Sequence, residues 1–285
     1  MELKRILVPT DFSETSIAAM RSAAFFARKF NSELLLLHVF ETPEFHASIE
    51  DLETALDKVV KERVEERLQQ LISEHEELQG LSVLPLIEPG RIHKVINAIA
   101  EAEGCDLIVM GTHGSTGLSN PERFILGSNA YRVVNASRVP VLTIRRKTPI
   151  REINNIVLPI DLSRETLQKE KAAVQLARLF GATLHVVTVI GFFSEYNPKV
   201  DDLIIEQQKL TERLAKEGIP YVEARIEYRD IADSIIDYAV DNLADLILIM
   251  TRQENLVEEF FLGSTARKII SRSPVPVLSI QPVKN

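Results

Sequence analysis

The chain has 285 residues, 45% of them hydrophobic and 26% charged, so it is long enough for two ordinary domains and apolar enough to pack both. Its formal net charge of −8 argues against broad binding to nucleic acids or anionic membranes. The single cysteine, Cys105, excludes an intramolecular disulfide, and no apolar run approaches the roughly 18 residues that a membrane helix needs. These features predict a soluble cytoplasmic protein with no nucleic-acid or membrane partner.

In the first half of the chain, short apolar runs typical of buried strands alternate with segments whose apolar residues recur at helical spacing. Ser13 is a candidate N-cap of the first helix. In chain order we expect a strand at 5–9, a helix at 13–30, a strand at 33–40, a helix at 49–78, a strand at 82–87, a helix at 91–103, a strand at 106–110, a helix at 128–137 and a strand at 140–145. Such alternation predicts a doubly wound α/β domain, in which helices cover both faces of a parallel sheet.

The helix expected at 49–78 is long, charged and amphipathic. Its apolar face consists of Leu52, Leu56, Val60, Val64, Leu68 and Leu71. The helix at the corresponding place in the second half is expected to be shorter, at 201–217.

The second half of the chain repeats the first. Residues 6–13, ILVPTDFS, recur 150 positions later as residues 156–163, IVLPIDLS. Further blocks recur in the same order, with LGS at 126–128 and 262–264 and VPVL beginning at Val139 and Val275. We therefore predict two related domains, residues 1–147 and residues 148–285, because the period is far too long for a solenoid repeat.

Four segments of the first half should meet at one edge of its sheet, where ligands of doubly wound domains bind. They are Pro9–Asp11, Val39, Gly111–Gly114 and Gly127–Ser128. The carboxylate of Asp11 can accept hydrogen bonds from an amino group or a ribose. The glycines let the backbone approach a phosphate, and the start of the last helix favours an anion. Together these features outline a site for an adenine nucleotide.

These motifs, PTDFS after the first strand, MGTHG after the fourth and then LGS and PVLTI, resemble the universal stress protein family over essentially the whole chain, twice. The resemblance implies a five-stranded parallel sheet in each domain, pairing of the domains through their last strands and, in some members, ATP binding. If the family's site residues are carried over to this chain, Asp11, Val39, Met110 and Gly111 would hold adenosine. Gly114, Gly127 and Ser128 would hold the phosphates. Pro9, Thr10, His113 and Asn129 complete the candidate set.

The family's ATP signature is glycine, two residues, glycine, nine residues, and glycine with serine or threonine. In the first half twelve residues, 115–126, separate Gly114 from Gly127, and in the second half Met250 and Gln253 replace both loop glycines. We therefore expect ATP, ADP or AMP, with Mg²⁺ accompanying ATP, in the first domain alone.

Other interpretations stand beside this one. Asp11 and Asp161 can simply cap the following helix, and Gly127 and Gly263 can serve close packing of helix and sheet, whereas Gly111 and Gly114 favour a ligand. The sequence shows no catalytic set and no metal-ligand spacing, so at most slow ATP hydrolysis is expected. The competing hypotheses are a scaffold that presents paired domains to partners, with a homo-oligomer also compatible, and an enzyme of the wider adenine-nucleotide-binding α/β group.

Overall fold

A computed structural model describes residues 2–41, 50–112, 127–145, 149–160, 166–191, 198–228, 230–251 and 263–281. The elements of the first half are β1 (Arg5–Pro9), α1 (Glu14–Phe30), β2 (Glu33–Phe40), α2 (Glu50–Glu74), η1 (Glu76–Leu78), β3 (Val83–Pro89), α3 (Ile92–Ala102), β4 (Leu107–Gly111), α4 (Ser128–Ala136) and β5 (Val141–Ile144). Those of the second half are β6 (Asn155–Ile160), α5 (Thr166–Phe180), β7 (Thr183–Gly191), α6 (Pro198–Lys216), β8 (Tyr221–Tyr228), α7 (Ile231–Asp241), β9 (Leu246–Met250), α8 (Ser264–Arg272) and β10 (Val277–Ile280).

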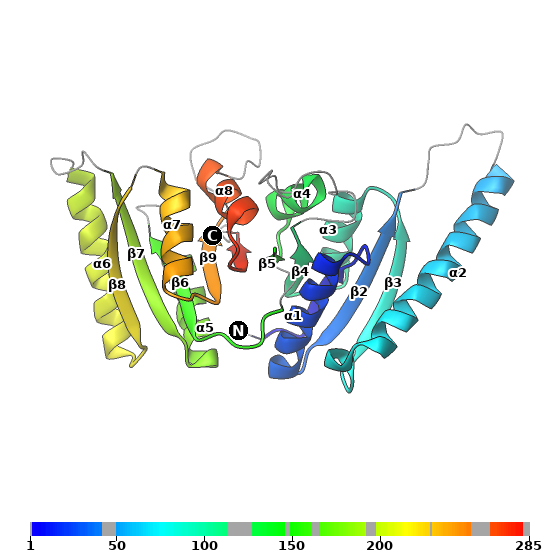
Figure 1. Ribbon diagram of the computed structural model, residues 1–285, viewed down its shortest axis with the longest axis horizontal. Coiled ribbons are helices and arrows are strands. Elements are labelled where there is room, and N and C mark those ends of the chain that lie inside the picture. The colour runs from blue at the N-terminus through cyan, green and yellow to red at the C-terminus, as the bar shows by residue number, and fades with distance from the viewer. Residues whose placement is uncertain are drawn as a thin grey trace.

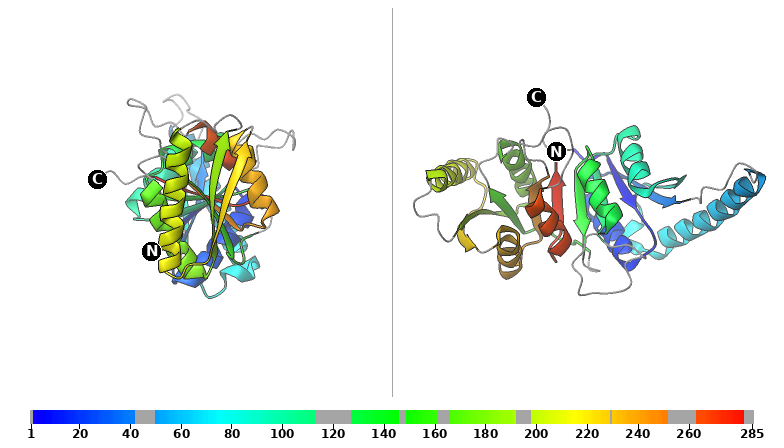
Figure 2. Two further views of the ribbon diagram at one scale, coloured as in Figure 1. Left: turned by 90° about the vertical axis from the view of Figure 1, so that its left-hand side faces the viewer. Right: turned by 90° about the horizontal axis from the view of Figure 1, so that it is seen from above.

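The strands of the described residues form one ten-stranded sheet, in the order β3-β2-β1-β4-β5-β10-β9-β6-β7-β8 (Figure 1). Strand pairing is parallel within each half, which confirms the predicted α/β class. At the centre β5 and β10 pair antiparallel, with Leu142 opposite Leu278 (Figure 2, right). The predicted pairing of the last strands is therefore present, and it removes two sheet edges that would otherwise be exposed.

Two apolar cores extend through both halves. One contains residues of α1, α2, α5 and α6, and the other contains residues of α3, α4, α7 and α8. In the first of these cores Phe180 of α5 contacts three rings of α1, with centroids 5.7 Å from Phe25, 5.9 Å from Phe26 and 6.4 Å from Phe30. The halves are thus joined by packed aromatic side chains as well as by strand pairing. The boundary predicted after residue 147 falls outside the described residues and stays a prediction.

The helix predicted at 49–78 is shorter than expected. It ends at Glu74, His75 adopts an extended conformation (φ −104°, ψ 108°), and the chain continues as η1. The guanidinium of Arg28 donates to the carbonyl oxygens of Glu76, Glu77 and Gln79 at 3.3, 2.9 and 3.2 Å. These contacts hold the η1 turn that follows α2 against α1.

The apolar face predicted for α2 is only partly buried. Leu68 and Leu71 are buried, but Val60 is 37% exposed, because the N-terminal part of α2 extends away from the sheet (Figure 1). The side chains of Leu52 and Leu56 lie outside the described ones.

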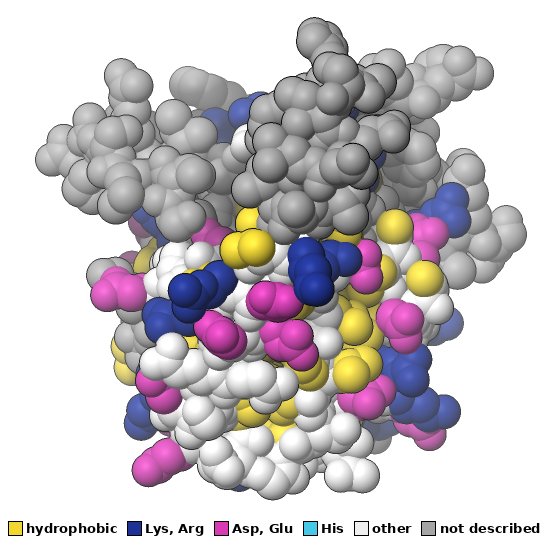
Figure 3. Space-filling view, turned by 90° about the vertical axis from the view of Figure 1, so that its right-hand side faces the viewer, with side chains coloured by type: hydrophobic (Ala, Val, Ile, Leu, Met, Phe, Trp, Pro, Cys, Tyr) yellow, Lys and Arg dark blue, Asp and Glu magenta, His cyan; other side chains and the backbone are white. Residues whose placement is uncertain are grey.

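The outer edge of the first half is formed by β3 and α2. Leu84 of β3 is 42% exposed there, and Figure 3 shows apolar side chains on this face among charges of both signs. Pro85 and Pro89 of β3 lack an amide N–H, which limits the addition of another strand at this edge. No helix in the described part of the chain is long and apolar enough to cross a membrane.

Candidate functional site

Nine of the eleven residues predicted for the site line one pocket. It lies where β1, β2 and β4 end and where α4 begins, as expected for the carboxyl edge of a doubly wound sheet. The nine are Pro9, Thr10, Asp11, Val39, Met110, Gly111, Gly127, Ser128 and Asn129. His113 and Gly114 lie outside the described residues, as does the segment 115–126, so the phosphate contact expected of Gly114 and the place of His113 in the site stay predictions.

The pocket also has lining residues that the sequence reasoning missed: Ser16, Leu37, Ile92, Ile96, Thr112 and Ala130. The sequence contained a signal that could have placed three of them in the site. Leu37 precedes Val39 by two positions on the same strand and so shares its face, and Ile92 and Ile96 are one helical turn apart on α3. The wall formed by α3 was not predicted, because no motif marked this helix as part of the site.

The turn after β1 is held by its own side chains. Thr10 is buried, its Oγ1 lies 3.2 Å from Ser16 Oγ, and the Phe12 amide donates to this Oγ1 at 3.1 Å. Asp11 Oδ1 accepts from the amide of Ser13 at 3.1 Å, and Ser13 in turn caps α1 through its hydroxyl. Asp11 therefore stabilises the entry to α1 while it lines the pocket, so the two interpretations of this residue are compatible.

His38 supports the same turn from the side of α2. Its Nδ1 donates to the carbonyl oxygen of Thr10 at 2.8 Å, and its ring stacks on Phe12 with centroids 4.9 Å apart. Phe12 has a positive φ of 62°, which is uncommon for a bulky residue, and Arg67 lies 6.0 Å from its ring. These contacts compensate an unfavourable backbone conformation next to Asp11.

The two described glycines of the site, Gly111 and Gly127, are there for different structural reasons. A Cβ on Gly111 would lie 3.0 Å from Thr15 Cγ2 and 3.2 Å from the Thr15 carbonyl carbon, so close packing against α1 accounts for this glycine without a ligand. The sequence interpretation had favoured a ligand there. Gly127 is the N-cap of α4 and makes no side-chain cap, so the first amides of α4 rely on other acceptors. A helix start of this kind, at the wall of a pocket, favours an anion.

The model of the universal stress protein family matches residues 2–145 and matches again at residues 152–281. The chain belongs to the universal stress protein family. It is a tandem of two such units. Universal stress protein MJ0577 of Methanocaldococcus jannaschii is 34% identical over 159 residues, which cover 50% of this chain and 96% of that protein. Universal stress protein MJ0531 of the same organism is 33% identical over 144 residues, covering 50% of this chain and 82% of the relative.

A solved universal stress protein from Archaeoglobus fulgidus shares the fold of the whole tandem. Its TM-score to this chain is 0.75 at 24% identity, and the match covers 99% of this chain and 100% of the other. Two fused units are therefore an architecture that this family also adopts in a second chain of similar extent.

The second unit of this universal stress protein differs at the positions that correspond to the pocket. Asp161 and Gln253 lie outside the described residues. Thr188 stands where the first unit has His38, and among the described residues its buried hydroxyl has no hydrogen-bond partner. A Cβ on Gly263 would meet no described atom within 4 Å, so packing of helix against sheet does not account for this glycine, contrary to one sequence interpretation.

The described residues contain no preformed metal site. Among them, no group of three or more His, Cys, Asp or Glu side chains is arranged to hold a metal ion.

Proposed function

We propose that the first unit of this universal stress protein binds an adenine nucleotide, as a regulatory or protective protein of a stress response. The observation that carries the proposal is the convergence of four separate segments on one pocket at the carboxyl edge of the sheet. The ligand is ATP, ADP or AMP, with Mg²⁺ in the case of ATP.

The lining of the pocket suits the parts of such a ligand. Val39, Ile92 and Met110 provide apolar surface for a base, and Asp11 provides a carboxylate for an amino group or a ribose hydroxyl. Gly127 and Ser128 provide backbone amides and a hydroxyl for phosphate oxygens at the start of α4. In this proposal the residues bind and orient the nucleotide, and none of them is assigned a catalytic step.

Calorimetric titration of the full chain with ATP, ADP and AMP, with and without Mg²⁺, tests the proposal. Val39→Trp should fill the pocket and abolish the binding heat. Val189→Trp is the matched control, because Val189 is the equivalent position of the second unit and is also a partly buried strand residue. Thermal unfolding of both variants checks that they fold. No binding heat from the wild type with any of the three nucleotides would refute the proposal, and so would equal binding by the two variants.

A second candidate function is a rigid interaction scaffold. It is favoured by the continuous ten-stranded sheet and by the two cores shared between the units, which fix the two units relative to each other. It predicts that the chain binds a protein partner with the same affinity whether or not Val39→Trp fills the pocket.

A further inference from the structure

Three cationic residues lie on two helices, close in the chain to residues that line the pocket. Arg91 and Lys94 lie at the start of α3, on either side of the pocket residue Ile92, and Arg132 lies on α4, one turn after Ser128. We call Arg91, Lys94 and Arg132 the cationic rim. All three side chains are exposed to solvent.

The three charges all act on one residue of α3, His93. Burial, and then the positive charges of Arg132, Lys94 and Arg91, lower the pKa of this imidazole. Glu41 acts in the opposite direction and is the weakest of these influences. The rim thus gathers three positive charges in a protein whose formal net charge is −8.

No carboxylate of the described residues forms an ion pair with the cationic rim. Arg91 is the N-cap of α3 but makes no side-chain cap, and neither Lys94 nor Arg132 makes a side-chain hydrogen bond within the described chain. Gathering like charges without a counter-charge costs free energy, because each disfavours the charged form of the others.

The second unit shows the same scaffold with this charge neutralised. Helices α3 and α7 are both 11 residues long, α4 and α8 are both nine, and the corresponding positions can be paired directly. Asp230 replaces Arg91, Asp233 replaces Lys94, and Lys268 replaces Arg132.

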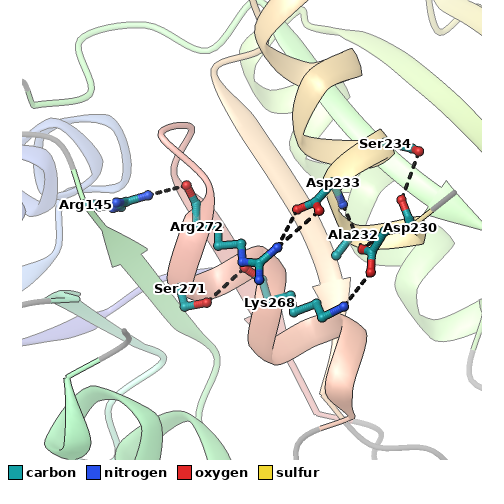
Figure 4. Close-up of polar contacts among 8 residues, drawn as sticks. All are labelled: Arg145, Asp230, Ala232, Asp233, Ser234, Lys268, Ser271 and Arg272. Carbon is teal, nitrogen blue, oxygen red and sulfur yellow. Dashed lines mark hydrogen bonds and ion pairs between the residues drawn. The ribbon is translucent and has the colours of Figure 1, made fainter. Parts of the chain in front are cut away.

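These residues form ion pairs with one another and with Arg272, as Figure 4 shows. Lys268 pairs with Asp230, and Arg272 Nη1 donates to both carboxylate oxygens of Asp233, at 2.8 and 3.1 Å. Asp230 Oδ1 also caps α7 by accepting from the amides of Ala232 and Asp233. The second unit is thus neutralised here by its own ion pairs, whereas within the described residues the three rim cations of the first unit have no such pair.

We propose that the cationic rim binds a second phosphoryl group of the nucleotide, in addition to the one received at the start of α4. This inference rests on the proposed function and names its ligand class as an adenosine that carries at least two phosphoryl groups. The second group is either the next phosphate of a 5′-chain or a phosphate on the ribose. Both offer the same doubly charged oxygens to arginine and lysine donors.

The test compares three nucleotides that differ by one phosphoryl group: AMP, ADP and adenosine 3′,5′-bisphosphate. The rim variant carries Arg91→Gln, Lys94→Gln and Arg132→Gln in the full chain. Its control carries Lys171→Gln, Lys209→Gln and Lys216→Gln, which remove three exposed charges from α5 and α6 of the second unit and change the net charge equally. Titration calorimetry at fixed ionic strength gives each Kd, because exposed charges respond strongly to salt.

We expect the wild type and the control to bind ADP or the bisphosphate at least about tenfold more tightly than AMP, as about threefold per rim charge would give. The rim variant should lose that advantage and keep its affinity for AMP within about twofold. Whichever ligand loses affinity identifies the position of the second group. The inference is wrong if the advantage survives in the rim variant, or if the wild type binds AMP as tightly as both others. If the wild type binds none of the three, the proposed function fails first.

Discussion

Arg267 of α8 lies over the ring of Tyr131 of α4, with its guanidinium carbon 4.9 Å from the ring centroid, and this contact joins the two units. The two residues occupy equivalent positions, 136 residues apart in the repeated sequence. In a symmetric dimer of identical units a residue at this position would face its own copy. Fusion of two different copies lets a cation and an aromatic ring meet there instead.

This contact should contribute measurable stability. A double-mutant cycle with Tyr131→Ala, Arg267→Ala and both together should give a coupling energy of about 0.5–1 kcal/mol, as for a partly exposed cation–π pair. Urea unfolding of the four proteins measures it. A coupling energy of zero would mean that the two side chains are adjacent without stabilising the junction.

The ring contacts of Phe180 between the two units should contribute more to stability than the Tyr131–Arg267 pair does. Phe180→Ala removes ring contacts to Phe25, Phe26 and Phe30 and should lower the free energy of unfolding by about 2–3 kcal/mol, somewhat less than for a fully buried phenylalanine. Val240→Ala is the control, because Val240 is 39% exposed and its truncation should change stability by less than about 0.5 kcal/mol. Equal unfolding midpoints for the two variants would contradict this prediction.

The sequence predicted most element boundaries because strong local signals set them. The strands at 5–9 and 33–40 are continuous apolar runs, and the Ser13 hydroxyl caps α1 as expected. The end of α2 was not predicted: the chain leaves the helix at His75 and forms η1, and the contact of η1 with Arg28, about 50 residues earlier in the chain, has no local sequence pattern.

The sequence predicted those site residues whose place follows directly from their position at the end of a strand. Segments that follow parallel strands must meet at one edge, and so Asp11, Val39 and Gly111 were found together. The reason for glycine at 111 was not visible, because the side chain it makes room for, Thr15, belongs to a helix far away in sequence. The cationic rim was missed because its members become neighbours only through the packing of α3 on α4.

Gly111→Ala tests whether packing accounts for this glycine. The added methyl would lie 3.0 Å from Thr15 Cγ2 and should cost about 1–3 kcal/mol of stability, as overpacking does. In a Thr15→Ser background that methyl group is absent, so part of the loss should be recovered. Gly263→Ser is the control, because that Cβ would meet no described atom within 4 Å and serine is a good N-cap. Unchanged unfolding in Gly111→Ala, or the same loss in the serine background, would contradict the packing explanation.

His185 should make the stability of the second unit depend on pH. Its Nδ1 lies 3.0 Å from the Tyr238 hydroxyl and its Nε2 lies 3.3 Å from Asn155 Oδ1, an arrangement that suits a neutral ring. Burial lowers the pKa of His185 in the folded chain, below the value of about 6.5 expected when unfolded. The unfolded state therefore binds more protons between the two pKa values, so this stabilisation is complete above pH 6.5 and declines as the pH falls below it.

His185→Leu isolates this effect, because leucine is the residue at the equivalent position of the first unit, Leu35. Urea unfolding midpoints should fall more steeply from pH 7.5 to pH 5 in the wild type than in the variant. His93, whose pKa is also lowered by burial, contributes equally to both proteins and cancels in the difference. The variant should be less stable than the wild type at pH 7.5, because Tyr238 and Asn155 lose their partner, and this deficit should shrink on acidification. Parallel pH profiles would mean that His185 does not titrate with folding.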